Sequence, residues 1–303
     1  MQSMVYLCKV VIINPNTLPK HTQKNTNMKT SKLDTDVTNF VQSVKAATNK
    51  KEQITLTVGM RKALEQGLQD TTVRGYLTAY RKAVTLEFGE TTHLLKYLRL
   101  PKAKGQRIKS KYQAEIQSRT ENNELTPIPN HLELINFACS LLESESYLKV
   151  ALGLMLVAGR RSIEILKTAK FTTVPRKSFE VVFEGQAKLK DKIEVPYTIP
   201  ILAPAKAVIK ALEYIREQKK EFATLTDKEL NKKCGNSLNK TCKRLFELWL
   251  GGECSPHDLR KAYAAICYHN TNKKNSFRGF ASKILGHNSD SDLTTETYFK
   301  YTI

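Results

Sequence analysis

Apolar residues recur at three- and four-residue spacing along most of the chain, and this period predicts amphipathic helices rather than strands. Between residues 33 and 100 the pattern predicts helices whose apolar faces pack against one another. One of these helices is expected at residues 72–84. The residues placed on the inward faces are Phe40, Val41, Val44, Leu64, Leu68, Val73, Leu77, Tyr80 and Val84.

A second group of elements begins near Thr126, where the segment T-P-I-P-N supplies turn-forming residues. Ser255, Pro256 and Asp258 suit the N-cap, the first position and the first turn of a helix. Residues 217–244 are predicted to be charged helix and loop. Apolar spacing predicts the other helices at residues 131–142, 147–158, 205–216, 256–269 and 280–285.

Two short β-rich runs, at residues 179–183 and 193–199, flank a basic loop and predict a small hairpin with lysines at its tip. The expected fold class is therefore mainly α with a small antiparallel β-hairpin or sheet. Residues 31–100 and 126–303 form two predicted domains. Residues 1–30 are interpreted as a basic, flexible arm, with Met28 as an alternative start of the ordered protein.

Residues 101–125 are predicted to be a basic linker between the two domains. Its first twelve residues carry five positive charges and no acid, and mutual repulsion is expected to keep them extended as a strap across a DNA backbone. A merely soluble linker is the alternative. The charged residues of this run are Lys102, Lys104, Arg107, Lys109 and Lys111.

The net charge narrows the class of partner. The chain has 49 Lys and Arg against 29 Asp and Glu, a net charge of +20, which favours nucleic acid. A membrane surface is the alternative, but no basic amphipathic helix stands out. No transmembrane span is expected, because the longest apolar run, residues 150–158, is too short, and no signal peptide is expected either. Six cysteines in 303 residues indicate reduced thiols of a cytosolic protein.

The last twenty residues carry the most distinctive chemistry. His287 follows an L-G turn and stands eleven positions before Tyr298. A phenol, with a usual pKa of about 10, attacks a phosphodiester usefully only if cationic donors surround the phosphorus. His257 and Arg260 would share a face near a helix N-terminus, where anions are favoured. Further donors are expected in AGRRSIEIL (158–166) and FEGQAKLKD (183–191).

Taken together, these segments resemble the tyrosine recombinases, and more narrowly the hairpin telomere resolvases, or protelomerases, of phages and linear replicons. The broad resemblance is the order G-R-R-x-x-E, a hairpin lysine, H-x-x-R, L-G-H and a terminal tyrosine. The narrow resemblance lies in the double arginine of GRRSIEIL, the FEGQAK loop followed by VPYTIPIL, and the longer GHNSDSDLTTETY spacing. It covers residues 126–303 well and the front third loosely. It implies a tyrosine-recombinase-like catalytic domain preceded by a helical DNA core-binding domain.

The resemblance also implies roles for residues before the second arginine motif. Arg161, ahead of the buried-type Glu164, matches the first catalytic arginine, and Arg160 is a neighbour that touches the adjoining phosphate. Lys188 matches the hairpin lysine, which protonates the departing 5′-oxygen. A solvated surface is the alternative for each exposed cation. The residues expected to contact DNA are Arg74, Arg81, Lys82, Lys102, Lys104, Arg107, Lys109, Lys111, Arg160 and Lys190.

The resemblance assigns the remaining catalytic roles to the C-terminal third of the chain. Arg260 matches the second arginine and His257 is its partner. His287 is expected to hydrogen-bond a nonbridging oxygen, and Tyr298 to form a 3′-phosphotyrosyl bond. Tyr301, three residues further on, is an alternative nucleophile that would share a helix face with Tyr298, but the spacing from His287 favours Tyr298.

The expected function is telomere resolution by a homodimer on double-stranded DNA with an inverted repeat, in the cytoplasm or nucleoid of a prokaryotic cell or phage-infected host. A conventional tyrosine integrase and a non-catalytic DNA-binding protein are the alternatives. No metal or other cofactor is expected. A zinc site of Cys234, Cys242, Cys254 and His257 is disfavoured, because only the Cys254-x-x-His257 interval resembles a ligand spacing.

Overall fold

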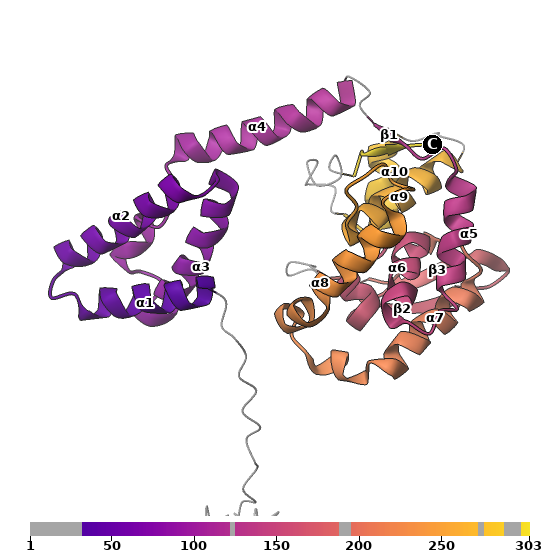
Figure 1. Cartoon of the computed structure of the whole chain (residues 1–303), viewed down its shortest axis with the longest axis horizontal. Coiled ribbons are helices and arrows are strands. Elements are labelled where there is room, and N and C mark those ends of the chain that lie inside the picture. Colours follow the sequence, from indigo (N-terminus) through magenta and orange to yellow (C-terminus); the bar gives the residue numbers. More distant parts are fainter. Residues whose placement is uncertain (1–31, 122–124, 188–194, 272–275, 288–297) are drawn as a thin grey trace, which may run out of the picture. The chain divides into compact units, whose positions relative to one another are not determined.

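The computed structural model describes residues 32–121, 125–187, 195–271, 276–287 and 298–303. They divide into two compact units at the boundary between Ile108 and Lys109 (Figure 1). The predicted arm at residues 1–30 and the predicted hairpin-tip residues Lys188 and Lys190 lie outside the described residues. The mainly helical fold class with a small antiparallel sheet is confirmed.

The first unit is a helical bundle around one small core. The inward positions predicted from the period are buried in this core, except that Leu64 and Leu68 pack against it half-buried. The Asn49 side chain accepts a hydrogen bond from the Glu52 amide and so caps one helix start. The elements are α1 (Lys32–Ala46), α2 (Lys50–Gly67), α3 (Asp70–Phe88) and the 3-10 turn η2 (His93–Lys96).

The basic run at residues 101–112 is helical, so the predicted extended strap is wrong. It opens α4 (Lys102–Glu121). Lysine, arginine, alanine and glutamine are good helix formers, and like-charge pairs on a helix cost only a few tenths of a kcal/mol each. One lysine also has acidic partners: Lys104 Nζ lies 2.9 Å from Asp70 Oδ1 and 3.3 Å from Glu65 Oε2. Local propensity therefore outweighs the repulsion on which the prediction rested.

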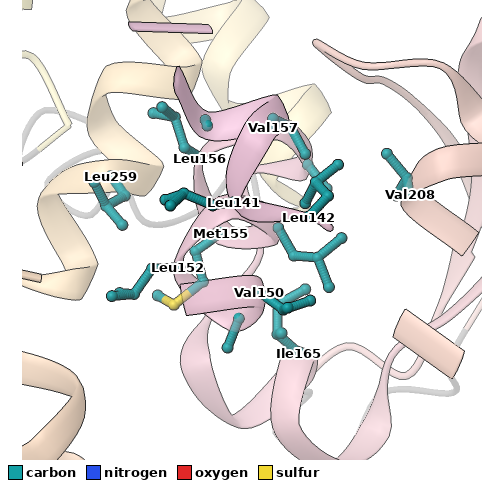
Figure 2. Packing of buried hydrophobic residues seen from close by; sticks show 14 of the residues in the cluster. Leu141, Leu142, Val150, Leu152, Met155, Leu156, Val157, Ile165, Val208 and Leu259 are labelled. Carbon is teal, nitrogen blue, oxygen red and sulfur yellow. The ribbon is translucent and has the colours of Figure 1, made fainter. Parts of the chain in front are cut away.

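The second unit is built around α6 (Tyr147–Ala158), whose residues from Val150 onward are all buried. A helix that is apolar on every side belongs inside the fold, and four other α-helices pack closely against α6. Figure 2 shows part of this buried cluster. The predicted ends of α6 and α9 are confirmed. The surrounding helices are α5 (His131–Leu141), α7 (Ala205–Gln218), α8 (Asp227–Phe246), α9 (Pro256–His269) and α10 (Phe277–Leu285), with the short turns η3 (Glu164–Thr168) and η4 (Lys220–Thr224).

A three-stranded antiparallel sheet of order β2-β3-β4 lies in the second unit. The predicted hairpin is confirmed as β3 (Lys177–Glu184) paired with β4 (Tyr197–Pro200), with Val181 opposite Ile199. The sequence analysis missed β2 (Lys170–Val174), a short edge strand with mostly exposed side chains and little apolar alternation. Its turn to β3 includes Arg176 at a φ of 61°.

A second, two-stranded sheet joins distant parts of the chain. β1 (Thr126–Pro127) and β5 (Tyr301–Thr302) are parallel, and the Thr126 and Ile128 amides donate to the carbonyls of Lys300 and Thr302 at 2.9 and 2.8 Å. Two-residue strands leave no periodic signal, so this sheet was not predicted. It fixes the residues that follow Tyr298 to the segment that precedes α5.

Gly159 ends α6 immediately before the two arginines, and no other residue fits there. Its φ is 64°, and a Cβ at this position would overlap the Tyr263 ring. We expect Gly159→Ala to lower the free energy of unfolding by about 2–3 kcal/mol. The matched control is Gly235→Ala within α8, where an added Cβ meets nothing within 4 Å. Because alanine has the higher helix propensity, this change should raise the free energy of unfolding by about 0.5–1 kcal/mol. Urea midpoints from the fluorescence of the single tryptophan, Trp249, measure both; equal midpoints for the two variants would contradict this packing.

Candidate active site

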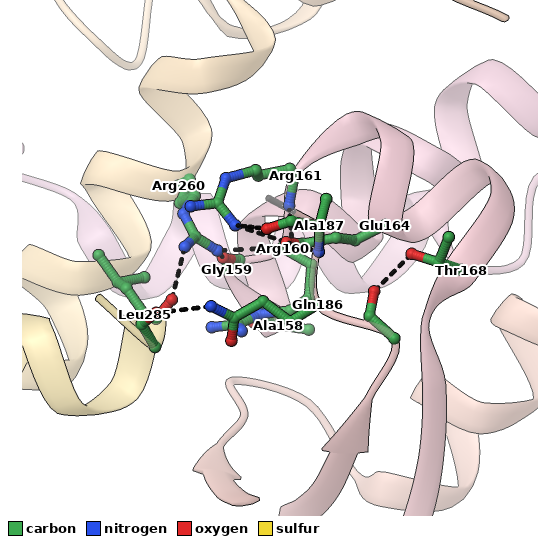
Figure 3. Close-up of polar contacts among 12 residues, drawn as sticks. Ala158, Gly159, Arg160, Arg161, Glu164, Thr168, Gln186, Ala187, Arg260 and Leu285 are labelled. Atoms are coloured by element: carbon green, nitrogen blue, oxygen red, sulfur yellow. Dashed lines mark hydrogen bonds and ion pairs between the residues drawn. The ribbon is translucent and has the colours of Figure 1, made fainter. Parts of the chain in front are cut away.

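A buried carboxylate organises the arginine motif. Glu164 is fully buried: its Oε2 accepts from the Arg161 amide at 2.7 Å, and its Oε1 accepts from Arg161 Nη1 at 2.6 Å and from the Ala187 amide at 3.1 Å (Figure 3). Arg260 Nη1 lies 3.7 Å from Oε2. One side chain therefore ties the end of α6, the FEGQAK loop and α9 together.

The arginines around Glu164 keep its carboxyl group ionised. Burial alone would raise the pKa of this carboxyl, but Arg260, Arg160 and Arg161 outweigh burial and hold the pKa below its usual range. The chain then makes a π-turn, in which the Ala169 amide donates to the Glu164 carbonyl at 2.7 Å. Such turns occur where a helix must redirect its side chains. The result is a fixed anion that aims Arg161.

Arg260 joins α9 to the C-terminal elements. Its Nη1 donates to the Gly159 carbonyl, its Nη2 to the Leu285 carbonyl at 2.8 Å, and its Nε to the Tyr298 hydroxyl oxygen at 3.2 Å. The side chain is fully buried, and this burial lowers its pKa to about 10. Arg260 remains a cation at neutral pH.

Two imidazoles flank the Tyr298 ring. The ring centroid of His257 lies 5.1 Å from that of Tyr298, and the centroid of His287 lies 4.8 Å from it. Burial, followed by the charges of Arg260 and Arg161, lowers the pKa of His287 to about 3. Partial burial and the nearby cation of Lys261 also lower the pKa of His257, which keeps an exposed edge. Both rings are therefore neutral at pH 7, and each offers one N–H donor and one acceptor nitrogen.

The segment after Tyr298 is anchored to α9. Lys300 Nζ lies 2.9 Å from Asp258 Oδ1, and the other carboxylate oxygen of Asp258 accepts from the Ser255 amide and hydroxyl at 3.0 and 2.6 Å. Burial opposes ionisation of Asp258, but these partners and Lys261 hold its pKa well below the usual range. Asp258, which completes the capping box of α9 with Ser255, thus also fixes the chain two residues past the phenol.

Tyr301 does not share a helix face with Tyr298, so that part of the prediction is wrong. Residues 298–300 form a turn and Tyr301 lies in β5, where pairing with β1 replaces helical hydrogen bonding. Its hydroxyl is buried and has no hydrogen-bond partner among the described residues. Burial raises the pKa of Tyr301. Tyr298, in contrast, contacts Arg260 and both histidines.

Arg160 is turned toward the protein interior. Its side chain is fully buried, its Nε donates to the Ala158 carbonyl at 3.1 Å, and its guanidinium lies 4.6 Å from the centre of the Phe183 ring. In this structure the guanidinium faces protein groups, and the predicted phosphate contact stays a prediction. The adjacent Arg161 keeps an exposed fraction of 20%.

The predicted DNA-binding residues in α3 and α4 divide by exposure. Arg81 and Lys82 line a hollow of about 410 Å³ on α3, together with Arg99. The Lys104 ammonium is engaged with Glu65 and Asp70, which makes it a weaker candidate. The exposed members are Arg74, Lys82, Lys102, Arg107, Lys109 and Lys111.

A zinc site does not assemble from the described residues. Cys242 and Cys254 bring their sulfur atoms within 3.5 Å, whereas Cys234 Sγ lies 3.9 Å from the Tyr147 hydroxyl. Within the described ranges no group of three or more His, Cys, Asp or Glu is placed to hold a metal ion. His257 instead contributes to the surroundings of Tyr298.

The sequence analysis missed three residues that shape this site. Lys300 had no recognisable signal, because a lysine near a chain end is normally solvated. Gln186 and Tyr197 were noted only as parts of the FEGQAK and VPYTIPIL segments.

None of the described helices is both long and apolar enough to span a bilayer.

Comparison with known proteins places this site in a family. The catalytic domain of the telomere resolvases ResT and TelK matches residues 124–301. Telomere resolvase ResT of Borreliella burgdorferi is 22% identical over 152 residues, which are 50% of this chain and 33% of ResT. The matched segment thus spans about a third of the length of that curated relative.

Solved structures agree with this match. A single-residue variant of protelomerase TelA, covalently complexed with substrate DNA, has a TM-score of 0.81 and 25% identity over 92% of this chain and 91% of TelA. Protelomerase TelK, complexed with substrate DNA, has a TM-score of 0.54 and 19% identity over 90% of this chain and 59% of TelK, a likeness of fold. The matched catalytic domain covers more than half of the residues of this chain, and the chain therefore belongs to the telomere resolvase ResT/TelK family.

Proposed function

We propose that this chain is a hairpin telomere resolvase, which cleaves and rejoins double-stranded DNA at an inverted repeat and leaves covalently closed hairpin ends. The observation that carries the proposal is the surroundings of one phenol: Arg260 Nε lies 3.2 Å from the Tyr298 hydroxyl oxygen, and both His257 and His287 pack on its ring. The family match supplies the substrate class, since TelA and TelK were both solved with substrate DNA.

The first step is attack by Tyr298 on a scissile phosphate. The Tyr298 O–P bond forms as the phenolic proton passes to the acceptor nitrogen of neutral His257. The P–O5′ bond breaks, and the departing 5′-oxygen takes a proton from Lys188 to become a free hydroxyl, the role that the family resemblance implies. Arg161 and Arg260 carry the two positive charges that the developing equatorial oxygens require. A neutral His287 contributes an N–H donor to the same oxygens.

The second step rejoins the strand. A 5′-hydroxyl from the opposite strand of the same duplex attacks the phosphotyrosyl phosphorus and gives its proton to Lys188, which is neutral after the first step. The Tyr298 O–P bond breaks, and the phenolate regains its proton from protonated His257. The phosphotyrosyl bond conserves the energy of the broken phosphodiester, so neither step needs a nucleotide or a metal ion. Folding each strand into a hairpin costs base pairing and stacking, which DNA contacts must offset.

An inverted repeat calls for two protomers. A two-fold protein pair matches a palindromic site, so we propose that the chain acts as a homodimer on DNA. The helical unit would serve as the core-binding domain through Arg74, Arg81 and Lys82, and the unit that follows would hold the chemistry. We propose that the protein acts on the nucleoid of a prokaryotic cell or phage-infected host.

The test is a cleavage assay without Mg²⁺ and ATP. The substrates are linear duplexes carrying a library of inverted repeats, with EDTA present, and the products are separated on a denaturing gel. Strands of doubled length that renature at once support the proposal, and sequencing them identifies the site. Joints between separate duplexes would indicate a conventional integrase instead. Sequence-selective binding without a covalent product would indicate a DNA-binding protein; either result overturns the proposal.

A further inference from the structure

Three of the four segments that distinguish this chain from ordinary integrases meet in one hydrogen-bonded chain. Arg160, from the double arginine, donates through Nη1 to the Tyr197 hydroxyl at 2.8 Å. Tyr197, from VPYTIPIL, donates to Gln186 Oε1 at 2.8 Å. Gln186, from FEGQAK, donates through Nε2 to the Gly286 carbonyl at 2.6 Å. We call these three side chains the α10 clamp.

The α10 clamp holds the backbone directly ahead of His287. Arg160 Nη2 donates to the Ile284 carbonyl at 2.6 Å and Arg260 Nη2 to the Leu285 carbonyl at 2.8 Å, so three consecutive carbonyls each receive a side-chain donor. The last carbonyls of a helix have no partner within the helix, and cations are favoured there. The next residue is His287, whose own amide donates to the Ser282 carbonyl at 2.9 Å.

The packing at Gly286 leaves little freedom. Gly286 has a φ of 64°, and a Cβ there would overlap both Gln186 Oε1 and the Tyr197 hydroxyl. Removing a guanidinium fully from water is costly unless its N–H groups have hydrogen-bond acceptors. The buried guanidinium of Arg160 has such acceptors in the Ile284 carbonyl of α10 and the Tyr197 hydroxyl. Arg260 is buried to the same extent, but its Nε donates to the Tyr298 hydroxyl. The donors of Arg160 instead go to Ala158, Tyr197 and Ile284, so they tie the end of α6 and β4 to the end of α10.

We infer that Arg160, Gln186 and Tyr197 are positioning residues that set the location of His287 against Tyr298. Arg160, next to a catalytic arginine in the sequence, would then serve the reaction through α10 and not through a phosphate. The consequence for catalysis rests on the proposed function, whereas the hold on α10 does not.

The first test measures the backbone of the DNA-free protein. Tyr197→Phe removes a single hydroxyl and keeps the ring that packs on Phe183. We expect hydrogen exchange of the His287 amide to speed up about tenfold in this variant. The matched control is Tyr214→Phe, which removes a hydroxyl that donates to the Glu145 carbonyl at 2.6 Å, and it should leave that amide unchanged. Unchanged exchange in Tyr197→Phe would overturn the inference.

The second test is a double-mutant cycle on single-turnover cleavage of the DNA site selected from the inverted-repeat library. Tyr197→Phe and Arg160→Lys should each slow formation of the phosphotyrosyl bond by about 10- to 100-fold at unchanged DNA affinity. In a His287→Gln background the same changes should slow formation of the phosphotyrosyl bond by less than about twofold, because the imidazole that they position is absent. Fully multiplicative losses would overturn the inference. Weaker DNA binding with a shallower salt dependence would also overturn it, and would restore Arg160 as a phosphate contact.

The two hypotheses fail in different ways. If the unaltered chain forms no phosphotyrosyl product on any inverted repeat, the proposed function fails while hydrogen exchange still decides whether the α10 clamp holds His287. If Arg160→Lys does not fold, Tyr197→Phe completes both tests alone.

Discussion

Tyr298→Phe should abolish strand cleavage, lowering the rate of phosphotyrosyl formation by at least about 10⁴-fold. The change removes the only atom that would bond to phosphorus, and the Arg260 Nε that lies 3.2 Å from it remains in place. DNA affinity should stay within about twofold, because the ring still packs between His257 and His287. Covalent protein–DNA complex on a denaturing protein gel measures the first effect, and a filter-binding titration measures the second.

Tyr301→Phe is the matched control, since it removes the same atom from the only other tyrosine in the described C-terminal segment. The Tyr301 hydroxyl is buried and has no hydrogen-bond partner among the described residues, so losing it should leave cleavage unchanged and stability equal or slightly higher. If Tyr298→Phe still gives covalent complex and Tyr301→Phe does not, the nucleophile is Tyr301, and the contacts of Tyr298 with Arg260 and the histidines serve packing alone.

Glu164→Gln should destabilise the second unit by about 3–5 kcal/mol and also disable the arginines. Three donors point at this carboxylate, namely the Arg161 and Ala187 amides and Arg161 Nη1. A glutamine has only one acceptor oxygen, so its NH₂ group would face a donor, and Arg260 would lose the counter-charge 3.7 Å from its Nη1. Urea unfolding followed by Trp249 fluorescence measures the stability, and cleavage by the folded fraction measures the activity.

Glu180→Gln makes the same chemical change on the surface. Glu180 lies in β3 and pairs with Lys177 at 3.2 Å, with both side chains exposed. Exposed ion pairs contribute little, so the unfolding free energy should change by less than about 0.5 kcal/mol. Similar losses for the two variants would show that Glu164 has no special role in holding Arg161 and Arg260.

Much of the fold could be predicted because the buried face of a helix appears in the sequence as apolar residues at regular local spacing. The positions of Val73, Leu77, Tyr80 and Val84 recur every three or four residues, and all four are buried in the core of the first unit. Strand pairing is different. The contacts of β1 with β5 join residues about 175 positions apart along the chain, and no local pattern encodes them.

The candidate site was predicted in part. The order of motifs indicated Arg161, Arg260, His257, His287 and Tyr298, and the structure brings these residues together around Glu164 and the phenol. Whether Arg160 or Arg161 faces outward could not be read from adjacent arginines, because the turn at Gly159 decides it. The helix at residues 102–121 was not predicted, because the prediction considered only the repulsion between like charges. It left out the helix propensity of the residues and the acidic partners of Lys104.

The sequence by itself determined the helical periods, the basic charge and the order of chemically distinctive residues, since each is a property of composition or of near neighbours. Only the tertiary structure decided which cations are buried, which tyrosine meets Arg260, and how Arg160, Gln186 and Tyr197 converge on the end of α10. Those outcomes depend on which distant segments exclude water together, and burial of that kind is settled by packing in three dimensions.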